Sequence, residues 1–182
     1  MPMEPGRYTF GPENATLTVR TKRTGAASKA GHDLLLEVTS WSATLELTRD
    51  AADTRLGLTA DAGSLRVLEG TGGIQALDDD DRAGIEQTID DEVLKGTAIE
   101  FRSSTVELGA DGAPAAVTGE LELAGSRHPI SFELHSGERG RLSGTAVVRQ
   151  TDWDMKPYSA LFGTLKVADD VEVAVETEPH AG

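Results

Sequence analysis

The chain has 182 residues, with 17 Lys and Arg against 31 Asp and Glu, and its formal net charge is −14. At about 150 residues per domain, this length predicts a single domain over residues 1–182, large enough for its own hydrophobic core. The absence of Cys excludes disulfide frameworks, thiolate zinc sites and cysteine nucleophiles, and the acid excess predicts that no nucleic acid is a partner.

The N-terminal segment shows no targeting signal. Met1 to Tyr8 contain no basic stretch followed by an apolar stretch, which is the pattern of a secretory signal. No apolar run in the chain approaches the roughly 20 residues that span a bilayer. We therefore expect a cytoplasmic protein without stable membrane insertion.

Alternation of apolar and polar residues dominates the chain. This two-residue period is typical of strands that bury one face, and turn pairs such as Asp111-Gly112 separate the segments. The apolar positions are, in chain order, Leu17 and Val19; Val38, Leu45 and Leu47 around Trp41; Leu56, Leu58, Ala60 and Ala62; Ile99, Phe101 and Ser103; Leu121 and Leu123; Ile130, Phe132 and Leu134; Leu142, Gly144, Ala146 and Val148; and Val171, Val173 and Val175. The pattern predicts a mainly β, antiparallel fold of about eight strands.

One segment has helical periodicity instead. Between residues 81 and 95, Ile85 and Ile89 recur at the spacing of one helix face. The run from Asp78 to Asp81 offers N-cap residues and favourable charges for the positive end of a helix, and Gly96 offers a C-terminal stop. We predict one amphipathic helix that packs over an end or edge of the sheet.

Many sequential antiparallel strands must hide their edges, either by closing into a barrel or by forming a sandwich. The interior of an eight-stranded barrel is filled by side chains or holds one small ligand. Small residues stand at the inward positions Ala60, Ala62, Gly144 and Ala146. They favour a cavity, whereas the close packing of two sheets is the alternative explanation of the same residues.

Short motifs follow one another in a definite order between Gly6 and Val175. They are Gly6-Arg7-Tyr8-Thr9-Phe10, Ser64-Leu65-Arg66-Val67, Asp91-Glu92-Val93-Leu94, Ile99-Glu100-Phe101-Arg102-Ser103, Val117-Thr118-Gly119-Glu120-Leu121-Glu122-Leu123-Ala124-Gly125, His128-Pro129-Ile130 and Arg149-Gln150-Thr151-Asp152-Trp153. Their order and spacing resemble the bacterial YceI-like family. The resemblance implies a lipocalin-like antiparallel β-barrel that binds long apolar chains such as polyisoprenoids.

A ligand of this kind would contact large apolar side chains on the inner face of the barrel. The candidates for ligand binding are Leu17, Val19, Leu36, Val38, Trp41, Leu58, Phe101, Phe132 and Phe162. Ordinary core packing is the alternative role for each of them. Leu161-Phe162-Gly163 follows a Pro-Tyr turn in a long connection, and long connections of this kind are often functional. The segment is expected either to form a flap over the barrel mouth or to be an ordinary loop anchored by its two aromatic residues.

The barrel pattern, the small inward residues and the resemblance to the YceI-like family together predict a non-catalytic binding protein for a long-chain isoprenoid or a fatty lipid. The four His residues are scattered without metal-ligand spacing, so we predict no metal, no cofactor and no catalytic residue. An alternative function, of a different class from lipid binding, is that of a filled barrel that serves as a protein-interaction or homodimerisation module. A third reading, an isomerase or hydrolase of an apolar substrate, requires a buried carboxylate or histidine in a ligand-sized cavity.

Overall fold

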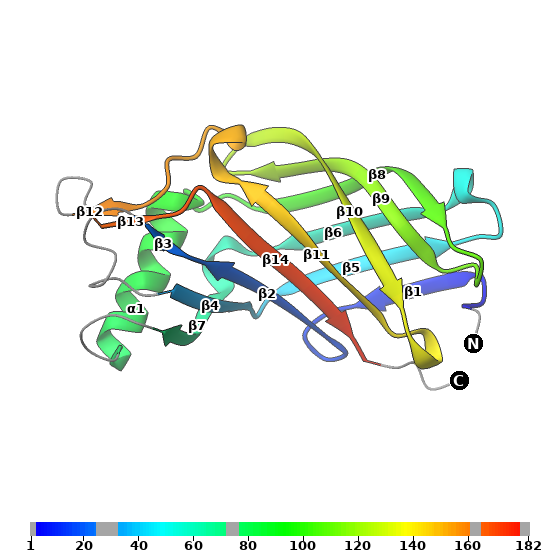
Figure 1. Ribbon diagram of the computed structural model, residues 1–182, viewed down its shortest axis with the longest axis horizontal. Helices are drawn as coiled ribbons and strands as arrows, with labels where there is room; N and C mark the ends of the chain where they lie inside the picture. Colours follow the sequence, from blue (N-terminus) through cyan, green and yellow to red (C-terminus); the bar gives the residue numbers. More distant parts are fainter. Residues whose placement is uncertain (1–2, 25–32, 72–76, 161–164, 179–182) are drawn as a thin grey trace.

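The computed structural model describes residues 3–24, 33–71, 77–160 and 165–178 as a curled antiparallel sheet with one α-helix (Figure 1). The larger sheet has eleven strands and the curvature of a half-barrel, consistent with a lipocalin-like barrel. In hydrogen-bonded order the strands are β1 (Gly6–Phe10), β5 (Trp41–Leu47), β6 (Arg55–Ala60), β8 (Ile99–Leu108), β9 (Pro114–Leu123), β10 (Ser126–Ser136), β11 (Leu142–Arg149), β14 (Asp170–Thr177), β2 (Ala15–Thr21), β4 (Asp33–Val38) and β7 (Leu65–Thr71). The predicted mainly β, antiparallel fold with one helix is confirmed.

Two bent pairs of strands bring the ends of this strand order together. Only Thr39 and Ser40 separate β4 from β5, and residues 61–64 separate β6 from β7. Strand β4 pairs with β2, near one end of the strand order, whereas β5 pairs with β6, near the other end. The bend between β4 and β5 therefore connects the two ends of the order. The bends are also bonded to each other, since the Thr39 N–H donates to the Ser64 carbonyl (2.9 Å) and the Asp61 N–H donates to the Ser40 carbonyl (3.0 Å).

The bends explain why the sheet has eleven strands where about eight were expected. If β4 with β5, and β6 with β7, are each counted as one bent strand, only β1 is added to the eight. The alternation through Ala60 and Ala62 predicts a single strand, and this is wrong, because β6 ends at Ala60 and a 3₁₀ turn occupies Ala62–Ser64. The Asp61 carboxylate accepts the Gly63 N–H at 2.9 Å and stabilises that turn.

A smaller sheet and the helix gather at one end of the barrel, on the left in Figure 1. The smaller sheet has the order β12 (Ser159–Ala160), β13 (Leu165–Val167) and β3 (Arg23–Thr24). Helix α1 (Asp79–Thr88) continues into a π-helical turn, Ile89–Val93. Further 3₁₀ turns occupy Ala51–Asp53, Glu138–Gly140 and Gln150–Trp153.

Helix α1 has the capping that its sequence predicts. Asp78 is the N-cap, and its carboxylate accepts the Asp81 N–H at 2.7 Å while the Asp81 carboxylate accepts the Asp78 N–H at 3.1 Å. This reciprocal pair is a capping box, which satisfies two backbone donors that the helix itself leaves unpaired. At the other end Lys95 and Gly96 take positive φ angles of 57° and 64°, which end the helical segment.

The end of the barrel opposite α1 contains a packed core. Strand β5 alternates buried and exposed residues, and its last two inward residues, Leu45 and Leu47, are buried. Val106 in β8 lies opposite Val117 in β9, and both are almost fully buried. Inward residues are therefore closely packed at this end of the barrel.

Candidate functional site

A cavity of about 760 Å³ occupies the barrel interior between α1 and the packed end. Every strand of the larger sheet contributes inward residues to the cavity wall, and α1 contributes one face. Leu142, the first residue of β11, and Thr177, the last of β14, belong to the wall, so the cavity extends along the barrel away from α1. The volume lies within the range of roughly 300–1,000 Å³ that is usual for ligand pockets. The sequence did not decide between a filled and a hollow barrel, and in the structure the interior is hollow.

Eight of the nine predicted ligand-binding residues face this cavity. They are Leu17, Val19, Leu36, Val38, Trp41, Leu58, Phe101 and Phe132. Phe162, together with the flap predicted at residues 161–163, lies outside the described residues. The structure thus brings the eight side chains to one interior surface, and their contact with a ligand stays a prediction.

Strand pairing explains why these residues share one surface. Val19 of β2 lies opposite Leu36 of β4, and Leu58 of β6 lies opposite Phe101 of β8. Residues that are directly opposite in an antiparallel pair project from the same face of the sheet. The register of the strands therefore aligns the inward apolar residues of neighbouring strands, and together they form one apolar wall.

A glycine in β9 gives the largest wall residues their room. Phe101 and Phe132 pack against each other with ring centroids 5.5 Å apart and ring planes inclined at 55°. A Cβ atom on Gly119 would lie 2.8 Å from the Phe101 ring and 2.2 Å from the Arg102 carbonyl oxygen. Because Gly119 has no side chain, the Phe101 ring can lie across β9 and contact Phe132.

Small residues leave much of the interior open. Ala60, Gly144 and Ala146 belong to the wall, as their inward positions predict. Ala62 does not, because it is buried in the 3₁₀ turn after β6. A Cβ atom on Gly144 would lie 2.6 Å from the Glu133 carbonyl oxygen, so this position requires glycine for the packing of β10 against β11.

Sequence reasoning missed part of the wall. The additional wall residues include Ile85, Ile89 and Val93 of the helical segment and Val171, Val173 and Val175 of β14. Their periodicity already placed them on inward faces, but their moderate size left them outside the set of large candidates. Sequence reasoning did not take into account the total volume of the inward side chains. A cavity forms where these side chains are too short to meet, so residues of moderate size also line it.

Helix α1 lies over the cavity and is attached to the edge strand β7. The Val67 N–H, on the side of β7 away from β4, donates to the Glu86 carboxylate at 3.0 Å. No residue of α1 is buried, and the inward side chain of Ile85 is only partly covered. The helix therefore covers the wall without the tight packing of a core helix.

Polar residues gather at the α1 end of the cavity. We define the rim as the wall residues Arg23, Asp80, Asp81, Gly84 and Tyr158. The Arg23 guanidinium lies 3.9 Å from the Asp33 carboxylate, and the Arg23 N–H donates to the same carboxylate at 2.9 Å. The rim thus combines one cation that has an acidic partner with two carboxylates on α1.

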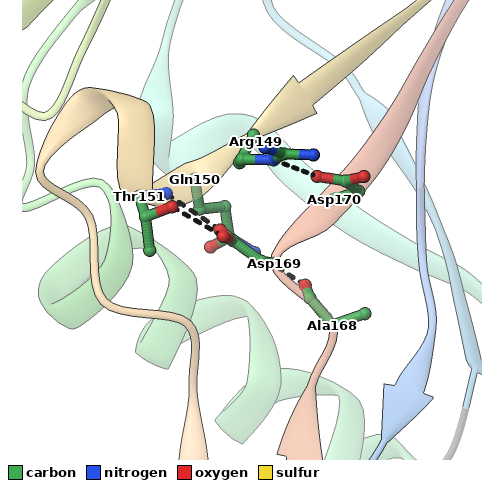
Figure 2. Close-up of polar contacts among 6 residues, drawn as sticks. All are labelled: Arg149, Gln150, Thr151, Ala168, Asp169 and Asp170. Atoms are coloured by element: carbon green, nitrogen blue, oxygen red, sulfur yellow. Dashed lines mark hydrogen bonds and ion pairs between the residues drawn. The ribbon is translucent and has the colours of Figure 1, made fainter.

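Figure 2 shows how the segment after β11 fixes the turn before β14. The Asp169 carboxylate accepts the Thr151 N–H at 2.8 Å and its hydroxyl at 2.6 Å, and the Gln150 N–H donates to the Asp169 carbonyl at 3.0 Å. Arg149 donates to Asp170 at 3.1 Å, which raises the pKa of the Arg149 guanidinium. The motif at residues 149–153 therefore positions the start of β14.

Two buried polar atoms in the wall have no hydrogen-bond partner among the described residues. They are the indole Nε1 of Trp41 and the hydroxyl Oγ1 of Thr21. Trp153 differs, because its Nε1 donates to the Leu121 carbonyl at 2.7 Å. A buried unpaired donor costs about 1–3 kcal/mol, and a polar group that reached either atom would remove this cost.

Ionisable side chains are confined to the rim within the described part of the wall, where they are Arg23, Asp80, Asp81 and Tyr158. His128 packs edge-on against Trp153 outside the wall, with ring centroids 5.7 Å apart. Over residues 3–24, 33–71, 77–160 and 165–178, no three His, Asp or Glu residues are grouped to hold a metal ion. In the same ranges no helix has the length and apolar character needed to cross a membrane.

Comparison with known proteins agrees with the fold. The family model of the YceI-like domain matches residues 8–179. The crystal structure of BcnA from Burkholderia cenocepacia is similar at a TM-score of 0.65 and 16% identity, covering 89% of this chain and 94% of BcnA. The YceI protein of Campylobacter jejuni is similar at a TM-score of 0.55 and 15% identity, covering 78% of this chain and 81% of that protein. At these identities the likeness shows the fold, and no curated protein matches the sequence.

Proposed function

The chain belongs to the YceI-like family, whose barrels generally bind hydrophobic ligands, and we propose that it is a non-catalytic binding protein. In this proposal the barrel interior holds a long-chain isoprenoid or another amphiphilic lipid. The observation that carries the proposal is the apolar cavity of about 760 Å³ that reaches from the rim to Leu142 and Thr177.

The cavity volume indicates the size of the ligand. An apolar cavity of about 150 Å³ holds one benzene molecule, or roughly 25 Å³ per carbon atom. By this ratio a cavity of about 760 Å³ holds on the order of 30 carbon atoms, or about six isoprene units. A fully enclosed chain of this length is thus the largest that the proposal supports.

The burial of such a chain supplies enough free energy for useful affinity. Each buried methylene contributes about 0.8 kcal/mol, so about 20 buried carbons contribute roughly 16 kcal/mol. Association costs on the order of 4–15 kcal/mol, and micromolar affinity corresponds to about 8 kcal/mol. Apolar contact alone is therefore of the right order, without a diagnostic polar motif.

Native mass spectrometry of protein purified from its native host tests the proposal. We expect a bound lipid at one copy per chain, which organic extraction and mass analysis would identify as a long-chain amphiphile. The matched control is the same preparation after delipidation, to which a polyprenol or a fatty lipid is added back. Apo spectra before and after this addition would contradict the proposal.

Two further predictions from the sequence, a possible homodimer and a cytoplasmic location, stay predictions. A homodimer would bury more than roughly 1,000 Å² of total surface, and light scattering at micromolar concentration tests for it. Leu68, Val147 and Tyr158 are the exposed large apolar side chains within the described residues; Leu68 lies on β7, Val147 on β11 and Tyr158 in the connection before β12. Fractionation of the native host against a cytoplasmic marker protein tests the predicted location.

A further inference from the structure

The rim of the cavity is where the head group of an amphiphile would lie. The interior wall of the described chain is mostly apolar, and its charged members Arg23, Asp80 and Asp81 all stand at the α1 end. An apolar tail gains free energy by filling the interior, and a polar head loses free energy if it is buried without partners. The tail would therefore extend toward Leu142 and the head would stay at the rim.

Two of the groups at the rim that could hold an anion, the Asp81 N–H and the Arg23 guanidinium, already have partners from the chain itself. Phosphates commonly bind at helix N-termini or to arginine. At the N-terminus of α1 the Asp81 N–H is taken by the Asp78 carboxylate at 2.7 Å, and the Arg23 guanidinium faces the Asp33 carboxylate at 3.9 Å. An anionic head would have to compete with both carboxylates.

The carboxylates of α1 add a repulsive charge at the same place. Asp79, Asp80 and Asp81 form the first turn of the helix, and Asp80 and Asp81 belong to the cavity wall. Both of these side chains are exposed, so they act on a head group through water. The field at the rim is therefore negative on the α1 side.

The rim also has room for a head group beside these carboxylates. Gly84 lies one turn after Asp80 and belongs to the wall, and a Cβ atom built on it would meet no other described residue within 4 Å. A glycine inside a helix costs roughly 0.5–1 kcal/mol relative to alanine, and no packing contact among the described residues accounts for it. The open space at Gly84 would let a bound molecule approach the helix backbone closely.

We propose that the cavity selects amphiphiles with an uncharged or cationic head and discriminates against phosphate and carboxylate heads. Asp80 and Asp81 are the residues that determine this specificity, through repulsion of an anion at the rim. The inference rests on the proposed function, because it names the ligand class of the same cavity.

Three probes with one tail separate the head groups: a C20 prenol, the corresponding prenylamine and the corresponding prenyl phosphate. Binding to delipidated protein is measured by titration calorimetry in detergent below its micellar concentration. At low ionic strength the phosphate should bind on the order of tenfold more weakly than the prenol. The amine should bind at least as tightly as the prenol. In 1 M salt, where the screening length falls to about 3 Å, the ratio of prenol to phosphate affinity should approach one.

The double variant Asp80→Asn with Asp81→Asn tests the assignment to these two residues. An amide oxygen at position 81 can still accept the Asp78 N–H, so the capping box is preserved. The matched control removes two carboxylates of the same helical segment that lie outside the wall, by Asp91→Asn with Glu92→Gln. We expect the ratio of prenol to phosphate affinity to narrow in the first variant and to persist in the control.

Each outcome has a distinct meaning. Equal or tighter binding of the phosphate to the unmodified protein would overturn the inference, and so would an equal narrowing of the ratio in the control variant. Neither result would affect the proposed function, because binding itself would be present. Failure of all three probes to bind would overturn the proposed function and, with it, the inference that rests on it.

Discussion

Filling the cavity from the wall should weaken ligand binding while it stabilises the empty protein. Ala146 of β11 faces the cavity and lies opposite Val173 of β14. The substitution Ala146→Leu adds three carbon atoms to a side chain that points into open volume. In a well-packed core such an addition would cause strain, but here the new side chain displaces only cavity contents.

The expected magnitudes follow from the three added carbons. If they displace three carbons of the ligand at about 0.8 kcal/mol each, binding loses about 2 kcal/mol, or roughly 30-fold in Kd. In the empty protein the same carbons become partly buried, and after the loss of side-chain entropy the gain is about 1 kcal/mol. For a chain of this size that gain corresponds to roughly 2–4 °C in Tm.

The matched control is Ala174→Leu, the same change on the neighbouring strand. Ala174 lies between the inward Val173 and Val175 and is not a wall residue. Lipid affinity by fluorescence titration and Tm of the delipidated protein are measured for both variants. A Kd for Ala146→Leu within threefold of the unmodified protein, together with a raised Tm, would refute the reasoning that a ligand occupies this volume.

Three further predictions concern the frame around the cavity. Gly119→Ala places a Cβ atom 2.2 Å from the Arg102 carbonyl oxygen and should destabilise the protein by about 3 kcal/mol, measured by urea unfolding. Asp78→Ala removes the N-cap of α1 and should cost about 1 kcal/mol, with faster amide hydrogen exchange confined to the helix. The hydroxyl of Ser136 donates to Asp111 and lowers the pKa of that carboxyl below its ordinary 3.8. A lowered folded pKa gives stability that is present above the unfolded pKa and lost as the pH falls through the folded pKa. Ser136→Ala should therefore show a smaller loss of stability below pH 3.8 in acid unfolding curves.

The strands were predictable from sequence because each has one face toward the barrel interior. In β5 the buried Trp41, Ala43 and Leu45 alternate with more exposed residues, and this period is visible without a structure. The bend at Thr39 and Ser40 was not predictable, because alternation continues through a short bend without a break. The two-residue strands β3 and β12 are too short to show a period at all.

The wall of the site was predictable in part, because the period of apolar residues indicates which face a residue lies on but not how the side chains pack. It assigns a residue such as Leu58 or Val173 to the inner face, but it does not indicate whether opposite side chains meet. Whether the interior is filled depends on the curvature of the sheet and on the sum of inward volumes, which include Gly144 and Ala146. The rim was missed because Arg23 and Asp80 come from segments far apart in the chain, and only the fold brings both to the wall of one cavity.

The distribution of packing in the barrel bears on how a ligand would enter. A void of this volume in an ordinary core would cost more than the stability of a typical domain, so the wall must be held by other means. Hydrogen-bonded pairing links every strand of the larger sheet, and a packed core lies around Leu45 and Val106 at the far end. The α1 end has weaker support, since α1 has no buried residue and its Glu86 carboxylate accepts one N–H from β7. We therefore expect a ligand to enter at the rim by displacing α1 while the strand pairing stays intact, because the energy of its burial would offset the few contacts that α1 loses.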